Sequence, residues 1–158
     1  MQRLEQLKKW LAQQYPGVEI QVEFAAADAD FRRYFRAIWP DGASRIVMDA
    51  PPDRMNTDAY VMVRDVFAMV RVPQILLRDR EQGFMLLEDL GKITYLAALQ
   101  HDERPQVHQH LLLEALDTLV DIQKASQPGV LPEYDEALLL RELNLFPEWY
   151  CAKELQKP

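Results

Sequence analysis

The sequence is short of cysteine, of positive charge and of long apolar runs, and each shortage excludes a class of protein. Its single cysteine, Cys151, excludes an internal disulfide framework and a cysteine-based zinc site within the chain. The 18 Lys and Arg residues are outnumbered by 25 Asp and Glu, and a net charge of −7 argues against binding to the phosphate backbone of nucleic acids. No apolar run approaches the roughly 20 residues of a membrane span, and residues 1–14 are charged rather than signal-like. We therefore expect a soluble, cytoplasmic protein without a nucleic-acid or membrane partner.

The 158 residues, of which 49% are hydrophobic and 27% charged, have the composition of a folded globular protein, and their number suits one sizeable core or two lobes of a small protein. In the first half, the spacing of apolar residues predicts two helices and five strands in the following order: helix 1–14, strands 18–24, 31–39 and 44–50, helix 57–70, and strands 74–78 and 84–87. Asn56 or Thr57 is the expected cap of the second helix. Short polar loops between strands favour antiparallel pairing, so this half is expected to be an antiparallel sheet with one packed helix.

The second half carries only helical patterns. Helices are expected over 94–100 and 105–125, and a third is expected to begin after Asp135. Pro105 suits the first position of its helix, and Pro147 should kink the last helix near Asn144. The whole chain therefore predicts an α+β fold, with the boundary between a β-rich and an all-helical part near residues 88–92.

Four separated blocks carry a family resemblance: DADFRRYFR at 28–36, VMDAPP at 47–52, GFMLLEDLG at 83–91 and YDEALLLRELNLFPEWY at 134–150. In this order they resemble the aminoglycoside phosphotransferase-like kinases, and most closely the bacterial kinases that phosphorylate the cell-wall amino sugars N-acetylmuramate and N-acetylglucosamine at the anomeric hydroxyl. The resemblance covers essentially the whole chain. It implies a protein-kinase-like small lobe over 1–87, a hinge over 88–92 and the first helices of an all-α large lobe over 93–158.

The function that this resemblance implies is ATP-dependent phosphoryl transfer to a sugar hydroxyl with Mg²⁺, in a cytoplasmic cell-wall recycling role. It implies nucleotide contacts from seven residues: Arg32, Arg36, Asp49, Leu87, Glu88, Asp89 and Leu90. The backbone of residues 87–90 would read the adenine edge, and the two arginines would face the phosphates. The alternatives are a simple strand end at 87–90, arginines on a solvated sheet face, and a turn-forming Asp49 before two prolines.

The chain departs from the kinase pattern on the third strand. Kinases place a lysine there and pair it with a glutamate on the next helix. Here Met48 or Asp49 stands at that position, and helix 57–70 offers only aspartates. We expect Arg32 or Arg36 to take the role of the lysine; the alternative is weaker phosphate binding in this lobe. The phosphate loop over 26–31 contains no glycine, and its Asp28 and Asp30 oppose a phosphate electrostatically.

The catalytic loop and the magnesium ligands of the family have no convincing match in these residues. The three histidines, His101, His108 and His110, lie in helical or linker patterns, so no catalytic residue and no metal ligand is expected within the chain. We expect the nucleotide-binding portion of a kinase whose magnesium ligands lie beyond Pro158. The alternative is a non-catalytic binding or interaction module that ends near Pro158. The expected partners are a small sugar substrate and a second copy of the chain that covers the apolar faces of the C-terminal helices.

Overall fold

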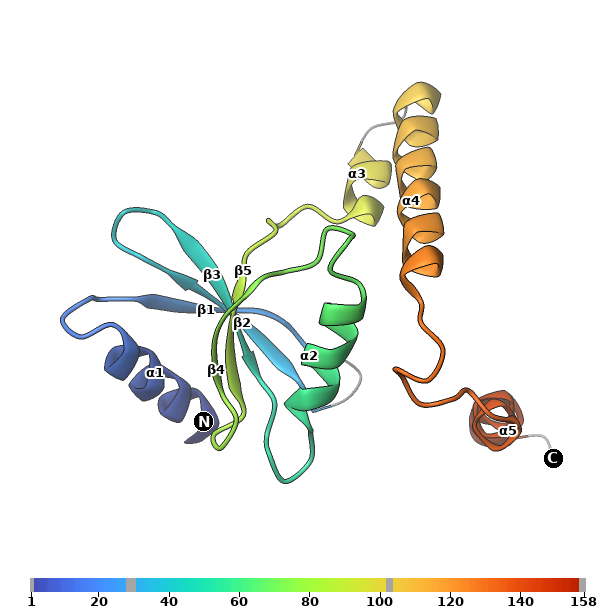
Figure 1. The fold of residues 1–158 in the computed structure, drawn as a ribbon, viewed down its shortest axis with the longest axis horizontal. Helices are drawn as coiled ribbons and strands as arrows, with labels where there is room; N and C mark the ends of the chain where they lie inside the picture. The colour runs from blue at the N-terminus through green and yellow to red at the C-terminus, as the bar shows by residue number, and fades with distance from the viewer. Residues whose placement is uncertain (1, 28–30, 102–103, 157–158) are drawn as a thin grey trace. The chain divides into compact units, whose positions relative to one another are not determined.

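The computed structural model describes residues 2–27, 31–101 and 104–156 (Figure 1). They form two compact units, one up to Ser126 and one from Gln127 onward. The first unit contains a sheet and four helices, α1 (Gln2–Gln14), α2 (Thr57–Val66), α3 (Tyr95–His101) and α4 (Pro105–Ala125). The second unit contains α5 (Glu136–Leu145) and the π-helix η1 (Phe146–Glu154).

The sheet has the five antiparallel strands that the sequence predicts. They are β1 (Gln21–Ala27), β2 (Arg33–Ile38), β3 (Ser44–Asp49), β4 (Ile75–Asp79) and β5 (Phe84–Glu88), in the spatial order β1-β2-β3-β5-β4. β1 begins at Gln21, later than the alternating pattern from Val18 indicates. The reason is its partner, because β2 ends at Ile38, which pairs with Gln21, and offers no residue beyond it.

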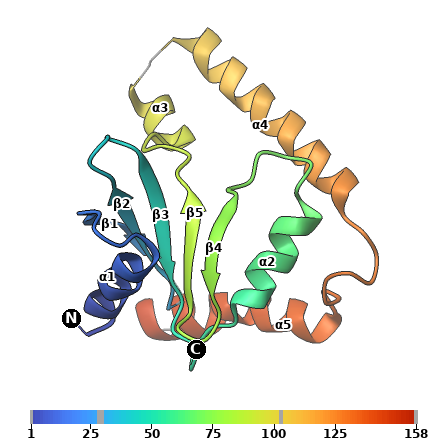
Figure 2. The same ribbon diagram turned by 60° about the vertical axis from the view of Figure 1, so that its left-hand side comes forward.

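Each face of the sheet carries one helix and one apolar layer (Figure 2). On one face, which we call the α1 face, residues of α1, β2, β3 and β5 pack together: Leu7, Trp10, Leu11, Phe35, Ala37, Val47, Phe84 and Leu86. On the opposite face, the α2 face, the buried residues are Met48, Ala50, Met85 and Leu87, with Tyr60 and Val61 of α2 packed against them. Successive side chains of a strand point to opposite faces, so this division assigns a face to every residue of β2, β3 and β5.

Local chemistry explains where the helices begin and end. The Asn56 side chain accepts a hydrogen bond from the backbone N–H of Asp58 at 2.7 Å, and it is the cap of α2, one of the two caps expected. Asp135 caps α5 in the same way, through Leu138 N–H at 2.8 Å. α4 begins at Pro105 and ends at Ala125, as predicted. α2 ends at Val66 instead of residue 70, and the chain continues there in turns.

The predicted kink at Pro147 is a change of helix type. α5 ends at Leu145, and the chain winds on as the π-helix with the proline in its first turn. A proline lacks the N–H that an α-helix needs and its ring collides with the preceding turn, so the regular ladder is interrupted at this point.

Both α4 and the second unit expose large apolar side chains. On α4 these are Leu112, Leu113, Leu116, Leu119 and Val120; in the second unit they include Leu139, Leu140, Leu143, Phe146 and Trp149. The homo-oligomer expected to cover such faces stays a prediction. Among the described residues, none of the helices combines the length and the apolar character that crossing a membrane requires.

Candidate functional site

The segment after β5 is tied to the sheet by its side chains. Leu87, at the end of the strand, is buried in the apolar layer of the α2 face. The backbone N–H of Glu88 donates to the carbonyl of Gln74 at 2.8 Å, and its carboxylate accepts from Arg71 at 2.6 Å. The end of β5 is therefore held against the chain that leads into β4, where the sequence predicts a hinge.

Asp89 ties this segment to β2 and β3 through its side chain. Its two oxygens accept hydrogen bonds from Arg36 Nε at 2.6 Å and Nη2 at 3.1 Å, from Ser44 Oγ at 2.7 Å and from the backbone N–H of Gly91 at 2.9 Å. The bond from Arg36, with those from Ser44 and Gly91, holds the pKa of the Asp89 carboxyl well below its usual range. The same bond raises the pKa of Arg36, so both groups stay charged at any physiological pH.

Leu90 lies between Asp89 and Gly91, and its own side chain is exposed. Its side chain is 49% exposed, and no hydrogen bond among the described residues involves its backbone N–H or C=O. The next residue, Gly91, has φ of +104°, a conformation that a residue with a Cβ rarely adopts. The chain therefore turns away from the sheet directly after a peptide that can still donate and accept hydrogen bonds.

Met48 is one of the two residues expected at the position of the lysine that kinases carry on the third strand. It is fully buried on the α2 face, where it pairs with Tyr34 of β2 and Met85 of β5. The kinase lysine must face the same way, because it pairs with a glutamate on the helix that follows the strand. Of the two alternatives, Met48 and Asp49, the one that faces α2 is Met48. The lysine–glutamate pair is replaced here by an apolar layer.

Arg32 lies beside Met48 on the α2 face. The two residues line one cavity of about 220 Å³ at the start of α2, together with Asn56. Arg32 also lines a larger and mostly apolar cavity of about 380 Å³ along α2, and a third of about 390 Å³ with Arg33 and Arg54. A guanidinium group is thus present where the strand-three lysine is missing. The predicted phosphate loop before it includes residues 28–30, which lie outside the described residues.

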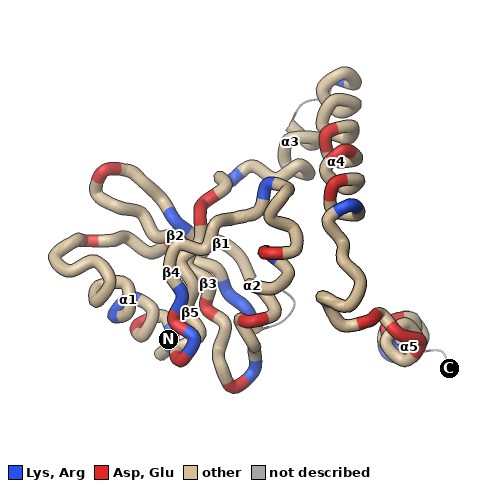
Figure 3. The backbone as a smooth tube through the Cα atoms, viewed as in Figure 1, with Lys and Arg blue, Asp and Glu red and all other residues tan. Residues whose placement is uncertain are grey.

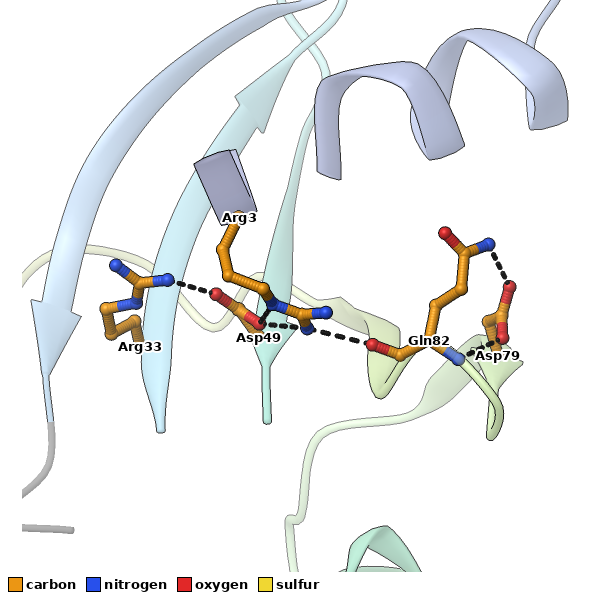
Figure 4. A network of polar contacts seen from close by, with 5 residues as sticks. All are labelled: Arg3, Arg33, Asp49, Asp79 and Gln82. Atoms are coloured by element: carbon orange, nitrogen blue, oxygen red, sulfur yellow. Dashed lines mark hydrogen bonds and ion pairs between the residues drawn. The ribbon is translucent and has the colours of Figure 1, made fainter. Parts of the chain in front are cut away.

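Asp49 lies on the opposite, α1 face, in the polar network of Figure 4. Its carboxylate is 0% exposed; one oxygen accepts from Arg3 Nε at 3.1 Å and Nη2 at 2.5 Å, and the other accepts from Arg33 Nη2 at 2.6 Å. Arg3 also donates to the carbonyl of Gln82 at 2.8 Å, which ties α1 to the turn between β4 and β5. This contact favours a structural role for Asp49. Its signal in the sequence is a carboxylate inside an apolar strand, which needs a cation as partner.

A second ionic cluster fixes the start of α2. The Asp58 carboxylate binds both Arg78 and Arg80 at the end of the β4 strand. The bond from Arg78 lowers the pKa of Asp58 below its usual value. Arg78 further donates to the hydroxyl of Thr57 at 2.7 Å. Figure 3 shows that acidic and basic residues are spread over the sheet and its helices.

The histidines and acidic residues form no metal centre in the part of the chain that the structure describes. No group of three or more His, Cys, Asp or Glu residues that could hold a metal ion occurs there. His101 ends α3, and His108 and His110 lie in α4, where His110 Nε2 is 3.4 Å from a Glu114 oxygen.

The order of the strands and helices defines a class of protein. A five-stranded antiparallel sheet, a helix between β3 and β4, and a connection from β5 into helices form the N-terminal lobe of a kinase-like protein, as the sequence predicts. The chain belongs to the phosphotransferase enzyme family (APH), whose sequence profile matches residues 21–157. The match begins at β1, so α1 and its Arg3 precede it.

Three similar proteins carry the same description, N-acetylmuramate/N-acetylglucosamine kinase. The protein from Neisseria meningitidis serogroup B is 54% identical over 155 residues, which are 98% of this chain and 46% of that protein. Those from Pseudomonas aeruginosa and Pseudomonas putida are 49% and 40% identical over 83% and 97% of this chain, and over 38% and 47% of their own lengths. The predicted family relationship is confirmed, and the chain spans less than half the length of these relatives.

Proposed function

We propose that these residues form the nucleotide-binding lobe of an ATP-dependent phosphotransferase that acts on the anomeric hydroxyl of a cell-wall amino sugar, N-acetylmuramate or N-acetylglucosamine. The observation that carries this proposal is the 54% identity with a kinase of that description over 98% of the chain. The kinase-like lobe and its hinge support it, because they supply the places at which such enzymes hold ATP.

In this proposal the adenine lies against residues 87–90 and the phosphates extend along the α2 face. Leu87, buried in the apolar layer, anchors this segment to the sheet, and the backbone of Glu88 and Leu90 offers hydrogen bonds to the edge of the ring. Arg32 is the cation for the phosphates, because it shares a cavity with Met48 at the lysine position. Arg36, the other arginine expected there, is bound to Asp89.

The reaction also needs a metal ion and a proton acceptor. Phosphoryl transfer from ATP uses Mg²⁺ to neutralise the phosphate charge and a carboxylate to receive the proton of the attacking hydroxyl. The described residues offer no cluster of metal ligands. What the lobe contributes is binding and orientation of the nucleotide, with its phosphates directed toward Arg32.

The test uses the protein expressed from its complete gene, incubated with ATP, Mg²⁺ and each amino sugar. We expect phosphate on the anomeric oxygen, detected by ³¹P NMR. Replacement of Arg32 by alanine should weaken ATP binding roughly ten- to hundredfold, because a hydrogen bond to a charged group contributes about 1.5–3 kcal/mol. Arg45→Ala is the matched control, since Arg45 lies on β3 but on the α1 face. Unchanged ATP affinity in Arg32→Ala would contradict the assignment, and ATP binding without any transfer would favour a non-catalytic binding module.

A further inference from the structure

The ion pair of Arg36 and Asp89 connects β2 to the hinge across an intervening strand. Arg36 pairs in the sheet with Ile46 of β3, and Ile46 pairs with Leu87 of β5, two residues before Asp89. Leu87 and Met48 lie in the layer of the α2 face, so the alternation of β2 and β3 places Arg36 on this face as well. The pair therefore lies on the side of the sheet where we place the nucleotide.

The pair is almost fully enclosed and its hydrogen bonds leave little freedom. The Arg36 side chain is 13% exposed and that of Asp89 is 6% exposed. Arg36 also donates to the carbonyl of Gly91 at 3.1 Å, while Asp89 accepts from the N–H of the same glycine at 2.9 Å. Both groups of Gly91 are thus bound to the pair. Leu90 is held from both sides, and its own peptide groups face no partner among the described residues.

We propose that Arg36 and Asp89 are positioning residues that hold the Leu90 peptide in one orientation and thereby make the site selective for adenine over guanine. The inference rests on the proposed function, and it reassigns both residues from contacts with the nucleotide to supports of its binding surface. Adenine presents an amino donor beside a ring acceptor, whereas guanine presents a carbonyl acceptor beside a ring donor. A backbone C=O and N–H that are fixed in place match the first pattern and are left unpaired by the second.

The proposed selectivity depends on a Leu90 peptide that cannot rotate. This distinguishes the proposal from the expectation that Arg36 contacts the phosphates of the nucleotide. A peptide that can rotate would satisfy either base, so loosening the ion pair should lower the affinity for ATP much more than that for GTP. An arginine that binds phosphate would act differently, because ATP and GTP carry the same triphosphate. Loss of such an arginine would weaken both nucleotides by the same factor.

The experiment measures the Kd of ATP and of GTP by calorimetry for the complete gene product and its variants. Arg36→Lys keeps the charge but cannot form the two-pronged bond, and Asp89→Asn removes the charge. We expect the ratio of the GTP Kd to the ATP Kd to fall about three- to tenfold in both, as the loss of one properly paired hydrogen bond implies. Ser44→Ala, which removes one of the four bonds to Asp89, should lower the ratio by about two- to threefold in the same direction and keeps the test available where the other variants fold poorly.

The matched control is Arg3→Lys, which disturbs another ion pair between an arginine and a buried aspartate, but on the α1 face. Its ratio should stay within about twofold of the wild-type value, because general loosening of the fold affects both nucleotides alike. Equal losses for ATP and GTP in the Arg36 and Asp89 variants would overturn the inference. Wild-type protein that binds neither nucleotide would overturn the proposed function itself. Binding of ATP without phosphoryl transfer would remove only the reaction, and the ratio would still decide the inference.

Discussion

Replacing Asp49 by asparagine should destabilise the fold by about 2–4 kcal/mol. Breaking a fully buried ion pair costs about 3–5 kcal/mol, because one charge stays behind without a partner. Here the partners, Arg3 and Arg33, are 27% and 39% exposed, so water can replace part of the lost interaction. The cost remains large because asparagine replaces one carboxylate oxygen by an NH2 group. This group cannot accept a hydrogen bond from a guanidinium group, so at least one of the three hydrogen bonds is lost.

The assay is urea unfolding followed by tryptophan fluorescence. Trp10 is a suitable reporter, since it is buried between α1 and the sheet with its ring centroid 5.6 Å from that of Phe84. Asp53→Asn is the matched control: its side chain is 75% exposed and 3.6 Å from Arg54, and exposed pairs of this kind contribute about 0–1 kcal/mol. An unfolding free energy of Asp49→Asn equal to that of the control would refute the structural role. A normal stability with weakened ATP binding would instead restore Asp49 as a nucleotide contact.

Two further predictions concern the turns and the pH dependence of the fold. Gly42→Ala and Gly83→Ala both place a side chain at positive φ, +85° and +71°, which costs roughly 1–2 kcal/mol. A Cβ at Gly83 would also lie 2.0 Å from the carbonyl oxygen of Ala50, so urea unfolding should show a stability loss for Gly83→Ala that is larger than that for Gly42→Ala by about 1–3 kcal/mol. Equal losses for the two variants would contradict this close approach. The hydrogen bond from Arg78 lowers the pKa of Asp58. The contribution of this ion pair to stability is therefore present above pH 3.8, the ordinary pKa of an aspartate, and is lost as the pH falls from there toward the pKa of Asp58 in the folded state. The stability difference between wild type and Asp58→Asn should therefore shrink in urea titrations at successively lower pH below 3.8, and a constant difference would contradict the ion pair.

Local chemistry determined the kinds of elements and most of their bounds. Alternation identified strands of the sheet, the cap candidates Asn56 or Thr57 and Asp135 marked helix starts, and Pro105 marked the start of α4. These signals act between residues only a few positions apart, so the sequence contains them directly. The four ordered blocks added the family, which the profile match over residues 21–157 confirms.

The tertiary structure decided which of the predicted site residues come together. Arg36 and Asp89 are 53 positions apart, and Arg3 and Asp49 are 46 apart. They meet because β5 pairs with β3 instead of lying at the edge of the sheet, and because α1 packs on the face that Asp49 shares. Alternation alone shows that Met48 and Asp49 face opposite ways, but only the placement of the two helices assigns Met48 to the α2 face and Asp49 to the α1 face. Such choices depend on strand order and helix packing, which are set by burial over the whole lobe rather than by any short stretch of sequence.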